Sequence, residues 1–490
     1  MSGLNAEDRR SYLQAIQRLG DAGRAEGAPQ QELARGFYPV AEHLRMLDPD
    51  VVLIVGPRGS GKTQIARVLT ESKLYESVSK YAPAVRLPTG KAEWIKAFPM
   101  EREGFDLIGF RSFVNSTKGD PKALQEFWFA YLVRILSSLL DAKDRKSIAP
   151  LLSAASSDPV SIHKAFIALG TVPVAVLDRL DEQLEQKNTF FFVTYDELDT
   201  LGGAGADWAL VDAGVGGLMS LWANYTRRWR HIRAKLFVRT DLYERNLHSG
   251  EADLAKLAAG RIELAWSDRD LYGLLLKRLS NGDTKLGEYI RGIRKTTWNE
   301  DPVLGFVPQL YTSQDARPIV ERLIGVYMGA NAKKGLVFRW LLDHVRDGRG
   351  RAYPRPFVRL IEEAARLELK DISAGTKQKL LEPSSIRQSL DSVSIEHVAQ
   401  SYSEWPWLNN VVDLLKQNPL VPYGEKDIVK LLKGLAVGTS AMSPPFAGQE
   451  LIDYLLELGI FRRRPDNRMD VPDLFLAGLG LKRKGGVVKG

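Results

Sequence analysis

Residues 56–63 read Gly56-Pro57-Arg58-Gly59-Ser60-Gly61-Lys62-Thr63. Upstream lies Val51–Val55, an unbroken apolar run that is typical of a strand buried on both faces of a parallel sheet. Downstream, Ile65, Val68 and Leu69 have helical spacing. The glycines let backbone N–H groups turn inward, and the helix directs its positive dipole end at the same point. This order of strand, glycine loop and helix predicts a cradle for phosphate groups.

The loop matches the whole nucleotide-binding pattern Gly-x-x-x-x-Gly-Lys-[Ser/Thr] of a P-loop. Lys62 would place its charge on the β- and γ-phosphate oxygens, and Thr63 would offer its hydroxyl to Mg²⁺. We expect the nucleotide to be bound by the loop and the residue after it, namely Gly56, Pro57, Arg58, Gly59, Ser60, Gly61, Lys62, Thr63 and Gln64.

A second apolar run ends in acidic residues and reads Phe190-Phe191-Phe192-Val193-Thr194-Tyr195-Asp196-Glu197. Asp196 would hold Mg²⁺, through water, on the far side from Thr63. Glu197 would polarise the attacking water as general base, because it stands next to the metal ligand without being one. Asp199 follows, and for it a helix cap or a solvated acid is as good an interpretation as a metal ligand.

A third strand is expected at Lys235–Arg239 and ends in Arg239, Thr240 and Asp241. Any of these three side chains could sense the γ-phosphate or orient water, and Arg239 is the one we select as catalytic. The alternative is a salt bridge or a helix cap. Arg355, in Tyr353-Pro354-Arg355-Pro356, begins a helix and is a second candidate for contact with the γ-phosphate; its alternative is surface charge.

The composition narrows the functional classes. The 490 residues carry a formal charge of +8, with 44% hydrophobic and 26% charged residues, which fits a globular protein of two or three domains. The absence of cysteine excludes disulfides, thiolate metal sites and a cysteine nucleophile. The sequence shows no 18-residue apolar run and no signal peptide, so we expect no membrane contact and a cytoplasmic location.

The end of the chain is basic. Residues 461–490 contain eight basic residues and three aspartates, and they follow a series of expected helices that ends in a short hairpin near residues 460–471. Helices followed by such a hairpin are the pattern of a winged helix. A basic wing and tail can follow DNA phosphates, although winged helices also dock proteins and solvated basic tails are common.

Strands that alternate with helices predict an α/β fold, a three-layer P-loop core with a parallel sheet. The expected parts are an N-terminal helical segment (1–48), the core (49–265) with an insertion around 85–180, a helical lid (266–395), and a winged-helix-like domain with a basic tail (396–490). The glycine-rich residues 201–217 predict a loop, and residues 371–395 an exposed connection or a weak helix.

These motifs resemble the AAA+/STAND division of P-loop ATPases, on the runs 56–63, 190–197 and 237–241 and on Pro354-Arg355. The winged-helix-like tail makes the layout similar to origin-recognition-type AAA+ proteins and to bacterial signalling or phage-defence ATPases. The chain departs from the family pattern in the long gap between Thr63 and Asp196 and in a sensor position shared between Arg239 and Thr240. No arginine finger can be assigned by motif.

The resemblance implies a Mg²⁺-dependent ATPase that switches conformation and reports its nucleotide state to a protein partner, either an effector or a neighbour in a homo-oligomer. It also implies ATP rather than GTP, and a setting in bacterial signalling or antiphage defence. The alternative is an ATP-regulated DNA-binding protein that contacts DNA through residues 461–490. A third interpretation is a scaffold that keeps ADP bound.

Overall fold

A computed structural model of the chain describes residues 4–20, 29–98, 104–202, 207–247, 257–293, 296–370, 379–438 and 442–484. The chain forms two compact units. One is Pro39–Ala265, and the other joins Met1–Tyr38 to Trp266–Gly490. The four-part division expected above stays an interpretation of the sequence.

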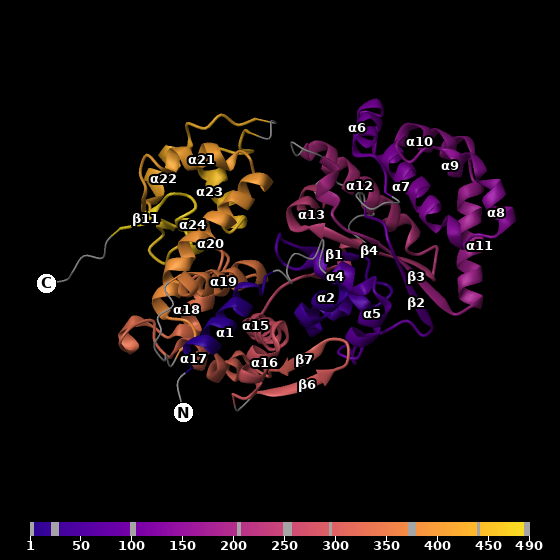
Figure 1. Cartoon of the computed structure of the whole chain (residues 1–490). Helices are drawn as coiled ribbons and strands as arrows, with labels where there is room; N and C mark the ends of the chain where they lie inside the picture. The colour runs from indigo at the N-terminus through magenta and orange to yellow at the C-terminus, as the bar shows by residue number, and fades with distance from the viewer. Residues whose placement is uncertain are drawn as a thin grey trace. The chain divides into compact units, whose positions relative to one another are not determined.

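The first unit is built on a parallel sheet, which has five strands in the described residues (Figure 1). Its strands lie in the order β2 (Lys91–Lys96), β3 (Thr189–Tyr195), β4 (Ile232–Arg239), β1 (Leu53–Gly56) and β5 (Ile262–Glu263). β4 pairs with both motif strands, with Arg239 beside Gly56 of β1 and Leu236 beside Tyr195 of β3. Because parallel strands end at the same edge, the residues that follow β1, β3 and β4 gather there.

Helices cover both faces of this sheet, which confirms the expected three-layer P-loop core. One face shares an apolar core with α7, α11 and α12, and the strands contribute to it Leu53, Val55, Val193, Tyr195, Leu236 and Val238. On the other face Trp94 stacks on Phe192, with ring centroids 4.3 Å apart, and Tyr75 of α5 packs on Trp94. The helices of this unit are α3 (Ala41–Leu44), α4 (Lys62–Leu69), α5 (Ser72–Ser79), α6 (Leu107–Ser116), α7 (Pro121–Ile135), α8 (Ala142–Ser147), α9 (Ala149–Ser153), α10 (Pro159–Ala168), α11 (Val172–Gln186), α12 (Trp208–Tyr225) and α13 (Thr240–Leu247), with short 3-10 turns η2 (Arg45–Leu47), η3 (Leu136–Leu139) and η4 (Leu198–Gly202).

The glycine-rich segment was wrongly predicted as a loop. Residues 203–206 lie outside the described residues, but η4 and α12 account for the rest of it. Asp207 accepts a hydrogen bond from the backbone N–H of Leu210 and so caps α12. A Cβ at Gly217 would lie 2.6 Å from the Cβ of Leu124, so this glycine lets α12 approach α7 closely. The glycines therefore serve helix packing.

The second unit is mainly helical. Before the core it has α1 (Ala6–Gln17) and α2 (Gln30–Gly36), and after it a helical region that the sequence analysis assigns to a lid. Helix α20 begins inside residues 371–395, with Pro383 in its first turn. Residues 383–395 are therefore helical, which agrees with the second of the two alternatives given for this segment. The elements of this region are α15 (Asp268–Gly282), α16 (Thr284–Arg291), the hairpin β6 (Thr297–Asp301) and β7 (Gly305–Gln309), η5 (Ser313–Ala316), α17 (Arg317–Ile324), η6 (Ala332–Lys334), α18 (Val337–Asp343), α19 (Pro354–Lys370) and α20 (Pro383–Glu404).

The chain ends in a winged-helix-like arrangement. Its elements are α21 (Leu408–Leu415), β8 (Leu420–Val421), α22 (Glu425–Leu432), α23 (Gly448–Glu457), β9 (Arg462–Arg463), β10 (Met469–Asp470), α24 (Asp473–Leu476) and β11 (Lys482–Arg483). β9 and β10 pair antiparallel as the wing, and Tyr423 bridges to Met469. Three helices followed by this hairpin confirm the expected pattern.

Among the described residues, no single helix is long and apolar enough to cross a bilayer. The pair α10 and α11, bent by 86° at its break, meets the same criterion by length and composition only.

Candidate nucleotide-binding site

The loop between β1 and α4 has the backbone that its glycines permit. Gly59 has a φ of 78° and Gly61 a φ of 99°, in the region that side chains with a Cβ rarely adopt. At Gly56 a Cβ would lie 2.5 Å from the hydroxyl of the buried Ser60, so there is no room for a side chain. Helix α4 then begins at Lys62. The loop is therefore shaped by local sequence, as predicted.

Lys62 folds back over this loop. Its Nζ donates hydrogen bonds to the carbonyl oxygens of Gly56 at 2.7 Å and Pro57 at 3.0 Å. Its charge also acts on two carboxylates that follow neighbouring strands, because it opposes the rise in the pKa of Asp196 and contributes to the lowered pKa of Asp241. The ammonium group thus stands where the ends of β1, β3 and β4 meet.

Asp196 follows β3 and is 2% exposed. Burial raises the pKa of its carboxyl group to about 6, while a hydrogen bond with Thr63 and the charge of Lys62 oppose this shift. Its Oδ2 atom is buried and has no hydrogen-bond partner within the described part of the chain. A buried carboxylate oxygen without a partner is costly unless a ligand satisfies it. Asp196 and the Thr63 hydroxyl together offer the oxygen donors that suit Mg²⁺.

Glu197 has an unusual backbone conformation. Its φ of 56° is uncommon for a residue with a side chain. The conformation is held by Thr200, whose backbone N–H and hydroxyl donate to the Glu197 carbonyl at 3.0 and 2.6 Å. Strain of this kind is concentrated at functional sites. The strain accords with the role of general base predicted from the sequence.

The three candidates at the end of β4 differ in how their polar atoms are used. Arg239 forms two hydrogen bonds with Asp241, at 3.0 and 2.9 Å, and a third with Asp199 at 3.3 Å. Asp241 also pairs with Arg245 at 3.3 Å. The hydroxyl of Thr240, by contrast, is buried and has no hydrogen-bond partner among the described residues. The hydroxyl of Thr240 is therefore available for a hydrogen bond with a ligand, whereas Arg239, the residue predicted to be catalytic, is bonded to two carboxylates.

Two predicted residues remain, Gln64 and Arg355. Gln64 has a buried Nε2 without a hydrogen-bond partner among the described residues. Arg355 belongs to the other unit, where it is exposed in the first turn of α19 and donates to the Gln400 side chain on α20 at 3.1 Å. Its contact with the γ-phosphate therefore stays a prediction.

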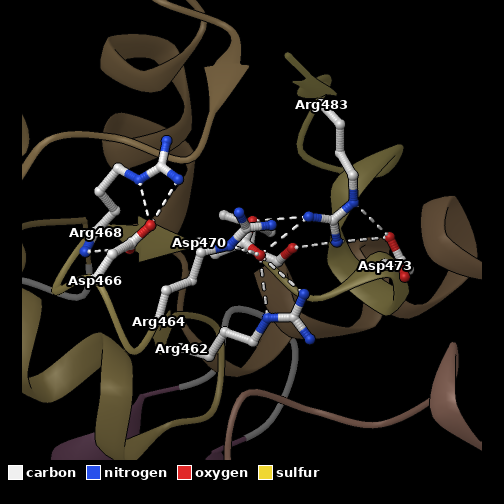
Figure 2. Close-up of polar contacts among 8 residues, drawn as sticks. Arg462, Arg464, Asp466, Arg468, Asp470, Asp473 and Arg483 are labelled. Atoms are coloured by element: carbon white, nitrogen blue, oxygen red, sulfur yellow. Dashed lines mark hydrogen bonds and ion pairs between the residues drawn. The ribbon is translucent and has the colours of Figure 1, made fainter. Parts of the chain in front are cut away.

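Three arginines of the basic C-terminal segment surround one buried acid. Figure 2 shows Asp470, which is fully buried, with the guanidinium groups of three arginines around it. The shortest contacts are 2.8 Å to Arg462, 3.0 Å to Arg464 and 2.9 Å to Arg483. Burial alone would raise the pKa of Asp470, but these arginines lower it below its ordinary value. The charge count of the sequence did not reveal this pairing.

We expect Asp470→Asn to destabilise the C-terminal domain by about 2–3 kcal/mol, because three partly exposed guanidinium groups lose their shared counter-ion. Chemical denaturation of the full chain measures the change. The matched control is Asp466→Asn, which removes an exposed partner of Arg468 and should leave the midpoint of the denaturation transition unchanged. Because the pKa of Asp470 is lowered on folding, its stabilisation is present above the unfolded value of about 3.9 and is lost as the pH falls through the folded value. Equal transitions for the two variants would contradict the prediction.

No protein-family model matches the chain, and no curated protein matches it. Among solved structures, the ORC2 protein of Aeropyrum pernix in ADPNP–ADP complexes is 12% identical, with a TM-score of 0.35, over 94% of this chain and 92% of that one. The ORC1 protein of the same organism, in complex with DNA, is 13% identical, with a TM-score of 0.33, over 98% and 93%. The ADP form of ORC2 is 12% identical, with a TM-score of 0.31, over 89% and 90%. At these TM-scores the likeness carries no argument about the function of this chain.

Proposed function

We propose that the chain is a Mg²⁺-dependent ATPase of the AAA+ type that acts as a conformational switch. The observation that carries this proposal is the buried Asp196, whose Oδ2 lacks a partner among the described residues while the carboxylate bonds to Thr63 and faces Lys62. A glycine loop, a lysine, a hydroxyl and a buried acid from a second strand are the parts that hold a nucleoside triphosphate with its metal. ATP rather than GTP follows from the family resemblance alone.

The residues divide the work between binding and chemistry. The loop N–H groups and Lys62 would bind the phosphates, with Thr63 and Asp196 as the residues that hold Mg²⁺. When bound, the metal would neutralise the charge that develops on the phosphate oxygens. Glu197 would accept the proton of the attacking water, and the Thr240 hydroxyl would orient that water or the γ-phosphate. Arg355 would report loss of the γ-phosphate to the helical region.

The output of the switch would pass to a protein partner, either an effector or a second copy in a homo-oligomer. Bacterial signalling and antiphage defence are settings that the family resemblance alone suggests. A contact with DNA through residues 461–490 is the second candidate, and the basic excess of this segment favours it. Two observations weigh against it. Carboxylates already pair with the arginines of the wing, and the exposed face of α23 carries Glu450, Asp453 and Glu457, which would repel phosphates.

The proposal is tested on the full chain by calorimetry with ATP and by phosphate release, each with MgCl₂ and with EDTA. We expect ATP to bind and phosphate to be released, and we expect EDTA to stop the release because Asp196 and Thr63 then lack the metal. GTP in place of ATP tests the choice of base. The proposal would be overturned if every purine triphosphate gave no heat of binding and no release of phosphate.

A further inference from the structure

We propose that Arg239 is a positioning residue, which holds Asp199 and through it the backbone that presents Glu197. The inference deepens the proposed function and rests on it. It assigns to Arg239 a role different from direct contact with the γ-phosphate.

The guanidinium group of Arg239 joins three segments. Its side chain is 6% exposed, and each of its three nitrogens has a carboxylate partner, with Nε and Nη2 on Asp241 and Nη1 on Asp199. Its Cζ atom lies over the ring of Trp208, 5.0 Å from the ring centroid, at the start of α12. Arg239 therefore links β4, η4 and α12, at the position in β4 that pairs with Gly56.

Asp199 connects this link to Glu197. It stands on η4 between Glu197 and Thr200, the residue whose two hydrogen bonds hold the Glu197 carbonyl. Leu198 and Leu201, which are buried, anchor the same turn from the core side. On the solvent side of this turn, where Asp199 is 37% exposed, the turn is held by the 3.3 Å contact between Arg239 and Asp199. A partly exposed pair of this kind contributes little to folding, so loss of this contact should leave the stability of the chain nearly unchanged.

Direct contact with a phosphate would disrupt this arrangement. To reach the nucleotide, Arg239 would have to leave Asp241, whose pKa Lys62 also helps to lower. Asp241 would then keep only its 3.3 Å pair with Arg245, and its carboxylate would compete with the phosphates for the charge of Lys62. With Arg239 and Arg245 on Asp241, the charge of Lys62 stays available for the ligand.

The test uses Asp199→Asn in the full chain, because Arg239→Ala removes a buried group and risks misfolding. The positioning role predicts that kcat falls by about ten- to a hundredfold, whereas KM and the affinities for ATP and ADP change less than about twofold. Asp199→Glu should restore part of kcat. The control is Asp50→Asn, which breaks a similar contact of 3.1 Å with Arg233 at the other end of β4 and should leave turnover unchanged.

The outcomes separate the two roles. If Arg239 were a γ-phosphate sensor, Asp199→Asn would remove one of the three hydrogen bonds that hold it on carboxylates, so kcat would stay or rise and the affinity for ATP alone would change; that result would overturn the inference. An unchanged kcat with unchanged affinities would overturn it as well. Absence of turnover in the wild-type chain would instead overturn the proposed function, and the inference with it.

Discussion

Replacing Lys62 by alanine is expected to weaken binding of Mg²⁺–ATP by at least about a hundredfold and to abolish measurable phosphate release. The loop backbone holds the ammonium group of Lys62 in place, because the carbonyls of Gly56 and Pro57 accept hydrogen bonds from it. Hydrogen bonds to charged groups contribute about 1.5–3 kcal/mol each, so two contacts with phosphate oxygens correspond to at least about 3 kcal/mol, or a hundredfold in affinity. Calorimetry with ATP and MgCl₂ measures the loss.

The control for Lys62→Ala is Lys73→Ala, which removes an exposed lysine from the next helix and should bind ATP like the wild-type chain. Thermal unfolding checks that both variants fold. Wild-type affinity in a folded Lys62→Ala variant would show that this loop does not bind the phosphates, and the assignment of Thr63 and Asp196 to the metal would fall with it.

The sheet strands that carry the motifs could be predicted because they are buried on both faces. Continuous apolar runs marked β1 and β3, and the third run lies inside β4. Strand β2 escaped prediction because Lys91 and Lys96 flank a short, half-buried segment at the edge of the sheet. β5 escaped because it has only two residues, Ile262 and Glu263. The alternation of apolar and polar residues that marks a strand cannot be recognised over so few residues.

The candidate site was predictable where its residues are adjacent in the chain or follow parallel strands of the same sheet. The contact between Thr63 and Asp196 is of this kind, since parallel order brings the two motifs to one edge. The partners of Arg239 could not be predicted, because Asp199 lies 40 residues away and Trp208 approaches from a helix mistaken for a loop. The same holds for the wing, where a count of charges does not reveal which ones pair.

Glu197→Gln is expected to retain ATP affinity within about threefold and to lower kcat by at least about a hundredfold, because general-base catalysis contributes about 10²–10⁴-fold. Glutamine keeps the length of the side chain but cannot accept a proton from water. The matched control is Glu93→Gln on β2, whose carboxylate pairs with Lys91 at the surface and should not affect turnover. Turnover above about a tenth of the wild-type rate would exclude Glu197 as the base.

The same variant decides how Asp199 acts. If Asp199 works only by holding the turn that presents Glu197, its substitution should have no further effect once Glu197 has lost its carboxylate. Effects of residues that act as a unit are strongly non-additive, whereas independent effects add in free energy. Single-turnover rates of Glu197→Gln and of Glu197→Gln with Asp199→Asn should therefore agree within about twofold. A further tenfold loss in the double variant would mean that Asp199 touches the reacting groups itself, as the metal-ligand interpretation of its sequence position requires.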